Sequence, residues 1–353
     1  MKNLSNEDNL GDFRKIQVTG GSTYIISLPK TWVEKMKLER GSVVSLHQSG
    51  DMSLNIRPQY DSNSKKPKKV IITITHKDKP ESVVRQLISS YLKGYNIIQI
   101  LSSEKRIDPE TRFAVKDFVR KKLVGTEILS DFSNDLTLQI LLSYTDLLVK
   151  DALKRMSILA VSMYQEAIQT LSSDDPQLAK DVINMDDEVD RFNFYVTRLL
   201  NIAVMDEQVM KEIGIASPRH CLGYRLIAKF IERLADHAAN IAKNRLALHL
   251  VPLSSEILEN LNKLSQSAIN VYETAIKSLL DEDYFEADKA MFESDETRNM
   301  EDEVIQRVVK SAPVEDIPQL RLIIESISRT SEYGADIAEA VLNLTVSDAV
   351  SEG

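Results

Sequence analysis

The second half of the chain repeats itself, and this repeat restricts the possible folds more than any other feature of the sequence. The pattern Tyr-x-x-Ala-Ile-x-x-Leu starts at Tyr164 and occurs again 108 residues later, starting at Tyr272. Apolar residues in this part of the chain follow the three- and four-residue steps of an amphipathic helix. We therefore expect a tandem duplication of helical units over residues 144–250 and 251–347.

Capping residues, several of them next to proline, mark the helix starts within the repeat. These signals divide it into six long helices. The interval between the second and third helices is longer in the first copy, which predicts an extension near residues 205–216. After the first helix, the starts lie at Asp175-Pro176, Ser217-Pro218, Pro252 with Ser254 or Ser255, Asp283 and Asp316.

Residues 70–143 alternate between strand and helix patterns in the order βαβαββ, which predicts a small α/β domain. This segment has no glycine-rich phosphate-binding loop. We expect it to serve spacing or dimerisation, and sensing of a small ligand is the alternative. The strands are expected at residues 70–74, 96–101, 126–129 and 136–142, and the helices at 80–93 and 109–122.

Residues 12–58 are dense in β-branched residues and broken by turn signals, which predicts four short strands and one short helix. A segment of this size buries too little surface to be stable alone, so we expect a partner chain. Residues 1–11 are expected to form a flexible tail. Residues 59–69 are polar and include four lysines, which is typical of a basic linker.

Charge is distributed unevenly along the chain. Residues 1–69 carry 12 lysines and arginines against 7 acidic residues, whereas the rest of the chain carries 32 against 46. This asymmetry suggests that a polyanion contacts the first segment and cations contact the rest; two solvated surfaces are the alternative. The single cysteine, Cys221, and the lack of a signal sequence or a long apolar stretch predict a cytoplasmic protein without membrane insertion.

Acidic residues recur at four-residue steps on two of the expected helices, so each set shares one helical face. Asp186 and Asp190 form one set, and Glu232, Asp236 and Asn240 form the other. Like charges at this spacing repel, and a bound cation removes the repulsion. Carboxylate and amide oxygens suit hard ions such as Mg²⁺, Mn²⁺, Ca²⁺ or iron. The alternative is that these acids lie on solvated faces or pair with neighbouring arginines.

The stretch Glu-Arg-Leu-Ala-Asp-His-Ala-Ala-Asn-Ile-Ala, which begins at Glu232, resembles the signature motif of PhoU proteins. This resemblance implies a mainly α fold of two three-helix bundles, each with a multinuclear site for divalent or iron-type metal ions. It also implies negative regulation of phosphate uptake through the phosphate transporter and its signalling partners. By position, the implied metal ligands are Asp186, Asp190, Glu232 and Asp236 in the first copy, and Asp295, Glu332 and Asp336 in the second.

The second copy departs from the motif. Asn299 replaces an acid and Ser328 stands where the first copy has Glu232, while Glu332 and Asp336 form a shifted acidic pair. The implied metal site of the second copy therefore lacks part of its ligand set.

Residues 12–58 resemble the AbrB/MazE/SpoVT swapped-hairpin family through Arg14-Lys15, Thr19-Gly20, Leu28-Pro29-Lys30, Trp32 and Gly41. That resemblance implies a homodimer in which two chains interleave into one barrel. It also makes Arg14, Lys15 and Lys30 the expected phosphate contacts on DNA. A dimerisation module, or an antitoxin-like module that binds protein, is the alternative.

Joining the two resemblances suggests a one-component regulator in which the helical repeat senses metal or phosphate status and the N-terminal segment binds DNA. The alternative is a regulator that acts by protein contact on the transporter or a kinase. We expect no enzyme activity, because a carboxylate-bridged metal oxidase in a helical bundle needs Glu-x-x-His motifs. None of the five histidines has a glutamate three residues before it.

Overall fold

The structure is a computed structural model that describes residues 13–48, 52–58, 67–249 and 252–346. The chain divides into two compact units, Met1–Lys66 and Pro67–Gly353. The predicted tail and most of the predicted basic linker lie outside the described residues. Within the described ranges, no helix combines the length and the apolar character that a membrane span requires.

The N-terminal unit contains two separate antiparallel hairpins and one short helix. None of the described side chains between residues 13 and 58 is buried. The four predicted strands and the helix are present, but a single chain builds no core from them. The elements are β1 (Gln17–Thr19), β2 (Thr23–Ile25), α1 (Lys30–Lys35), β3 (Val44–Gln48) and β4 (Leu54–Pro58).

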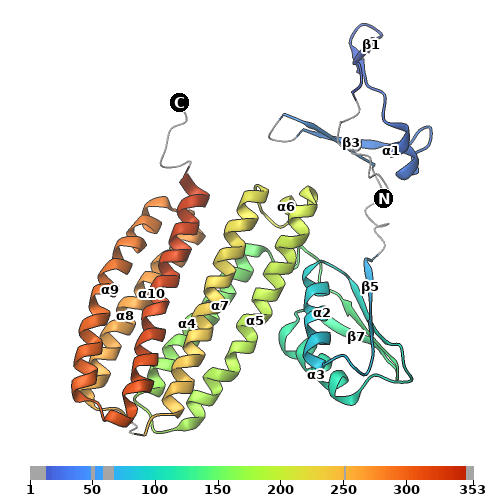
Figure 1. The fold of residues 1–353 in the computed structure, drawn as a ribbon. Coiled ribbons are helices and arrows are strands. Elements are labelled where there is room, and N and C mark those ends of the chain that lie inside the picture. The colour runs from blue at the N-terminus through green and yellow to red at the C-terminus, as the bar shows by residue number, and fades with distance from the viewer. Residues whose placement is uncertain (1–12, 49–51, 59–66, 250–251, 347–353) are drawn as a thin grey trace, which may run out of the picture. The chain divides into compact units, whose positions relative to one another are not determined.

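The second unit begins with a four-stranded sheet of order β5-β6-β8-β7, in which β5 and β6 are parallel and the other pairs antiparallel. Helices α2 and α3 cover one face of this sheet and form a single core with it (Figure 1). The predicted βαβαββ order is confirmed. The elements are β5 (Lys69–Ile74), α2 (Pro80–Leu92), β6 (Ile97–Ser102), α3 (Pro109–Lys122), β7 (Thr126–Asp131) and β8 (Asp135–Ile140).

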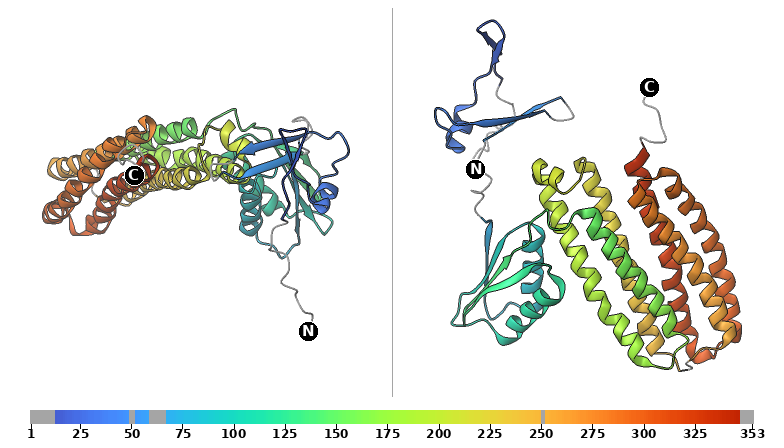
Figure 2. Two further views of the ribbon diagram at one scale, coloured as in Figure 1. Left: turned by 90° about the horizontal axis from the view of Figure 1, so that it is seen from above. Right: turned by 180° about the vertical axis from the view of Figure 1, so that it is seen from behind.

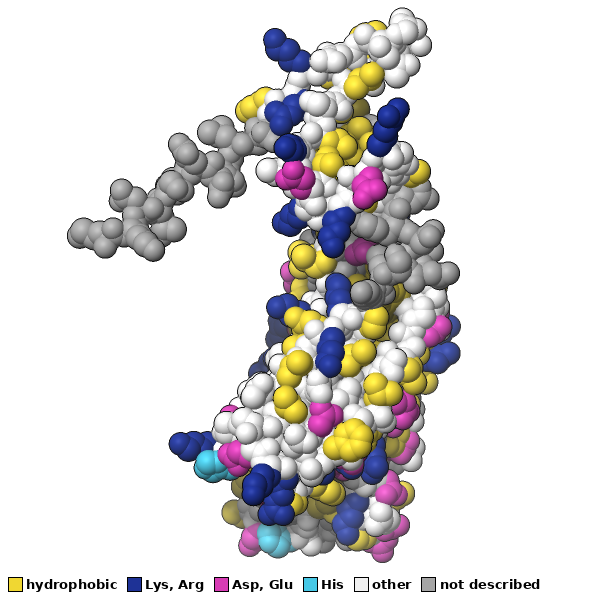
Figure 3. All heavy atoms as spheres, turned by 90° about the vertical axis from the view of Figure 1, so that its right-hand side faces the viewer, with side chains coloured by type: hydrophobic (Ala, Val, Ile, Leu, Met, Phe, Trp, Pro, Cys, Tyr) yellow, Lys and Arg dark blue, Asp and Glu magenta, His cyan; other side chains and the backbone are white. Residues whose placement is uncertain are grey.

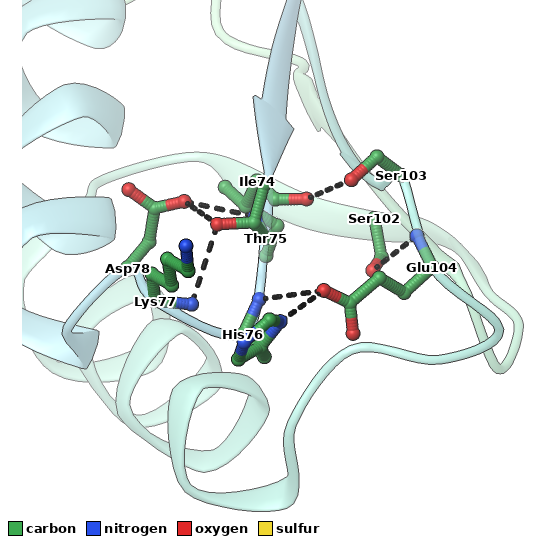
Figure 4. A network of polar contacts seen from close by, with 8 residues as sticks. All are labelled: Ile74, Thr75, His76, Lys77, Asp78, Ser102, Ser103 and Glu104. Atoms are coloured by element: carbon green, nitrogen blue, oxygen red, sulfur yellow. Dashed lines mark hydrogen bonds and ion pairs between the residues drawn. The ribbon is translucent and has the colours of Figure 1, made fainter.

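Ligands often bind at the carboxyl ends of the strands in α/β sheets. Here the residues that follow β5 and β6 form hydrogen bonds with one another (Figure 4). The backbone N–H of His76 donates to Glu104 Oε1 at 3.1 Å, and the His76 ring contacts the same carboxylate. The backbone N–H and the hydroxyl of Thr75 donate to Asp78 at 2.8 and 2.9 Å and lower the pKa of that carboxyl. The polar groups at this edge of the sheet thus bind one another.

The rest of the unit is helical. Helices α4, α5 and α7 pack as one bundle and α8, α9 and α10 as a second beside it (Figures 1 and 2). The mainly α fold of two three-helix bundles is confirmed, and α6 occupies the predicted extension. The elements are α4 (Val149–Thr170), α5 (Pro176–Met205), α6 (Glu207–Glu212), α7 (Pro218–Leu246), α8 (Ser255–Asp281), α9 (Tyr284–Ser311), the 3₁₀ turn η2 (Val314–Asp316) and α10 (Ile317–Thr345).

The repeated tyrosines connect the two bundles reciprocally. The Tyr164 hydroxyl on α4 donates to the backbone oxygen of Ser265 on α8 at 3.3 Å, and the Tyr272 hydroxyl on α8 donates to Ser157 Oγ on α4 at 3.1 Å. Both tyrosines are fully buried, and burial raises the pKa of each phenol. Because each tyrosine contacts a serine seven residues before its repeat-related partner, the duplicated sequence forms a duplicated contact.

Most of the predicted helix starts are confirmed by side-chain caps. Asp175 accepts from the N–H of Gln177, and Asp283 accepts from two N–H groups of the first turn of α9. Asp316 differs, because its carboxylate accepts instead from the backbone N–H of His249 at 2.7 Å and is fully buried. It therefore anchors the connection that follows α7.

Candidate functional site

Helices α5 and α7 bring together the four acids that the sequence indicated in the first copy. Burial, repulsion by Glu232 on the same helix, and repulsion by Asp186 and Asp190 on α5 raise the pKa of Asp236 to about 6. Burial and repulsion by Asp190 likewise raise the pKa of Asp186. We call these four side chains, Asp186, Asp190, Glu232 and Asp236, together with Asp187, the acidic face.

Lysines partly neutralise the acidic face. Lys122, the last residue of α3, places its Nζ 2.5 Å from Asp187 Oδ1 and 2.5 Å from Asp190 Oδ2. Burial alone would lower the pKa of Lys122, but these two hydrogen bonds outweigh it and the pKa is raised. On α7, Lys229 forms an ion pair with Glu232 one turn along the helix. The carboxylates still outnumber the lysines, so the face retains negative charge.

The residues of the acidic face carry the oxygen donors that a hard metal ion prefers, but their side chains are not grouped closely around one point in this structure. Asp186 Oδ1 is buried without a hydrogen-bond partner, which leaves a hard oxygen donor pointing into the protein. In the described part of the chain, however, no three His, Cys, Asp or Glu side chains are grouped closely enough to hold a metal ion. In this structure the cations that contact Asp187, Asp190 and Glu232 are lysines.

The second copy forms a different acidic cluster. Asp336 is buried in part, and burial with repulsion by Glu339 and Glu332 raises its pKa. Burial and repulsion by Glu332 also raise the pKa of Glu301 on α9. Asp295 lies apart, since its side chain is 72% exposed and pairs with Arg298 at 3.3 Å. Helix α9 therefore contributes Glu301 to this cluster, a residue that the sequence did not single out.

His237 contacts the second bundle. Its Nε2 lies 3.1 Å from the Tyr333 hydroxyl, and its ring lies 5.5 Å from the Tyr333 ring. Burial, followed by repulsion from Arg329, lowers the pKa of His237. His237 thus packs between α7 and α10 through its contacts with Tyr333. Cys221 is buried as well, and burial raises the pKa of its thiol.

The three residues expected to contact DNA are on the surface of the N-terminal unit. Arg14, Lys15 and Lys30 are all exposed. Lys30 begins α1 and lies 3.7 Å from Glu34 in an exposed ion pair, which is weak enough for a phosphate to replace. Figure 3 shows dark blue basic side chains and yellow hydrophobic ones together on this unit.

Two family models match the chain. Residues 153–244 match the PhoU domain, and this stretch contains every carboxylate of the acidic face. Residues 17–64 match the model described as antidote-toxin recognition MazE, bacterial antitoxin. The chain thus carries a PhoU domain and a MazE-type domain. PhoU regulators and MazE-type domains are non-enzymatic, which agrees with the expectation from the sequence.

The PhoU part of the chain also resembles individual proteins. Over 137 residues it is 25% identical to the phosphate-specific transport system accessory protein PhoU homolog 1 of Thermotoga maritima. This stretch is 38% of the present chain and spans 57% of that relative. The phosphate transport system regulatory protein PhoU of Streptococcus pneumoniae aligns with a TM-score of 0.49 and 17% identity, over 58% of this chain and 96% of that one. PhoU of Pseudomonas aeruginosa aligns with a TM-score of 0.45 and 16% identity, over 56% of this chain and 95% of that one.

Two contributions to these acidic clusters were not predicted from the sequence. Lys122 ends a helix whose last turn also contains Arg120 and Lys121, so by pattern it reads as an ordinary basic helix terminus. Nothing in the spacing connects it to an aspartate 68 residues later. Glu301 lies two residues beyond the position aligned with an acid of the first copy, and only a shift in helix register could have indicated it.

Proposed function

We propose that this chain is a dimeric regulator of phosphate uptake and phosphate homeostasis that binds DNA. The PhoU domain senses metal or phosphate status, and the MazE-type domain transmits the response as negative transcriptional control. The observation that carries this proposal is the presence, in one chain, of a basic MazE-type segment and a PhoU domain with a partly buried acidic face.

The metal part of the proposal rests on Asp186, Asp190, Glu232 and Asp236. Their oxygens are hard donors suited to a divalent or iron-type ion, and burial together with mutual repulsion raises the pKa of Asp186 and Asp236. We propose the same role for Glu332 and Asp336 in the second copy, where Glu301 supports them better than Asp295 does. A bound cation would remove the repulsion that the acidic clusters carry without it.

The dimer part of the proposal rests on the unburied apolar side chains of the MazE-type domain. Val18 and Tyr24 are cross-strand partners in the first hairpin, yet they are 58% and 75% exposed. A second chain that covers this surface would supply the core that one chain lacks. A dimer would also carry two copies of the Arg14, Lys15 and Lys30 set, and so double the number of phosphate contacts.

The DNA part can be tested by changing Arg14, Lys15 and Lys30 together to glutamine. Gel-shift titration on the promoters of phosphate transporter genes, near physiological salt, should show tight binding by the original chain. We expect the triple variant to bind about a hundred-fold more weakly or worse. Each lost phosphate contact should also reduce the slope of log affinity against log salt by about 0.9.

Binding of the promoters no tighter than random DNA would contradict the DNA part. The regulator would then act by protein contact, with the MazE-type domain serving only as a dimeriser. The relative from Thermotoga maritima is an accessory protein of a phosphate-specific transport system, which favours the transporter as that contact, with a signalling kinase as the alternative. A pull-down in the absence of DNA would identify it.

A further inference from the structure

The contact between Lys122 and the acidic face joins two different parts of the second unit. Lys122 belongs to the α/β domain, whereas Asp187 and Asp190 belong to the first helical bundle. The lysine side chain is only 17% exposed, so it is held at this position and does not extend into water. Its two neighbours on α3, Arg120 and Lys121, are exposed and already place positive charge at the end of that helix.

The Lys122 ammonium lies against an oxygen that a metal ion at the acidic face would use. Asp190 is one of the proposed ligands, and its Oδ2 accepts a hydrogen bond from Lys122 at 2.5 Å. While Lys122 donates to Asp190 Oδ2, a metal ion cannot coordinate this oxygen from the same direction, and a metal ion bound close by would repel the ammonium group where water is scarce. Lys229 on Glu232, Lys243, which acts on Asp186, and Arg225, which acts on Glu232, are further cations near the face, and all three belong to α7.

The α/β domain has further contacts with α5 that do not involve the acidic face. Arg198 donates to the backbone oxygen of Tyr91 at the end of α2, and its guanidinium lies 4.8 Å from the centre of the Tyr91 ring. Asn201 donates to the backbone oxygen of Leu92 at 3.1 Å. Helix α3 itself also packs on α5, because the Phe118 and Phe194 rings lie 5.7 Å apart in an edge-to-face contact. Loss of the Lys122 contact would therefore free only the last turn of α3, beyond Phe118, while the end of α2 stays attached.

We propose that Lys122 is a built-in cation of the PhoU acidic face, and that its binding there and the binding of a divalent metal ion exclude each other. Metal binding would release the end of α3 and so carry the state of the acidic face to the α/β domain. This inference rests on the proposed metal-binding function. It makes the α/β domain the part of the molecule that responds to the binding of a metal ion.

The test compares Mn²⁺ binding by the full chain, by Lys122→Met and by Lys121→Met, using calorimetry without chelator. Methionine keeps the length of the lysine stem and removes its charge. Lys121 is a matched control, because it lies on the same helix and pairs with Asp117 at 3.0 Å, whereas Lys122 pairs with Asp187 and Asp190. We expect Lys122→Met to bind Mn²⁺ about ten-fold more tightly than the original chain, and Lys121→Met to bind it equally.

A second measurement needs no variant. Amide hydrogen exchange of residues 119–122, the last turn of α3, should become faster in the original chain when Mn²⁺ is added, whereas residues 83–91 of α2 should not change. Equal Mn²⁺ affinity in all three proteins with loss of binding in Asp236→Asn would overturn the competition and leave the metal site standing. Absence of Mn²⁺ binding in every protein, with unchanged amide hydrogen exchange, would overturn both the competition and the proposed metal site.

Discussion

Replacing Asp236 by asparagine should raise the free energy of unfolding at pH 7 and, at the same time, abolish metal binding at the acidic face. The pKa of this carboxyl rises from 3.8 to about 6 on folding, because burial and three neighbouring acids disfavour its charge. A shift of roughly two pKa units corresponds to about 3 kcal/mol, and partial exposure to water reduces this to about 1 to 2 kcal/mol. Asparagine has nearly the same shape and no charge, so it should recover that amount.

The increase in the free energy of unfolding should depend on pH, and it should be larger at high pH than at low pH. Between about pH 4 and pH 6 the folded protein holds a proton on Asp236 that the unfolded chain releases, so this residue makes the original chain less stable as pH rises. Below about pH 4 the carboxyl is protonated in both states and the penalty is absent. The stability difference between Asp236→Asn and the original chain should therefore be small near pH 4 and reach its full size above pH 6.

Urea unfolding in the presence of a chelator, at several pH values, measures this difference. Asp288→Asn is the matched control, because Asp288 is exposed on α9 and lies outside both acidic clusters. We expect the control to show no pH-dependent gain. A variant no more stable than the original chain above pH 6 would contradict the account of the acidic face as a site of net repulsion between carboxylates.

A double change of Val18→Asp and Tyr24→Asp should convert the protein from a dimer to a monomer. These residues face each other across the first hairpin and are largely exposed in a single chain. Burying an apolar side chain of this size contributes about 1.5 to 3 kcal/mol, and two charges in each chain would lose that contribution and repel across the interface. Affinity for DNA should fall at least about a hundred-fold, because each monomer keeps only half of the phosphate contacts.

Sedimentation at micromolar concentration and gel-shift titration check this result. Phe113→Asp is the control, since Phe113 is 71% exposed on α3 and belongs to the other unit. It should leave the oligomeric state and the DNA affinity unchanged. A double variant that remains dimeric would show that the MazE-type domain is not where the chains associate.

The fold could be predicted from the sequence largely because the residues that begin its helices act on backbone groups close to them in the sequence. Asp175-Pro176 and Asp283 begin helices through hydrogen bonds to N–H groups two or three residues away, so the sequence contains the whole interaction. The helical period and the internal repeat then predicted the number of long helices in the two bundles. Asp316 shows the limit, because its carboxylate binds His249, 67 residues earlier, and not its own helix.

The candidate site was predictable only within each helix. Spacing placed Glu232 and Asp236 on one face of α7, but it could not indicate which cation lies against that face. Lys122 reaches it from another domain, through a contact that depends on how α3 packs against α5. In the second copy a small change of register moved the acidic contribution of α9 to Glu301, which a comparison of sequence positions could not detect.

The central claim is that the state of the PhoU domain controls DNA binding by the MazE-type domain of the same chain. DNA affinity of the full chain, measured by gel shift on a phosphate transporter promoter with Mn²⁺ and then with chelator, tests it most directly. We predict a change of about ten-fold between the two conditions, within the usual range of coupling between sites, and no change in Asp236→Asn. Equal affinity with and without Mn²⁺ in the original chain, under conditions where the metal is shown to bind, would contradict the claim.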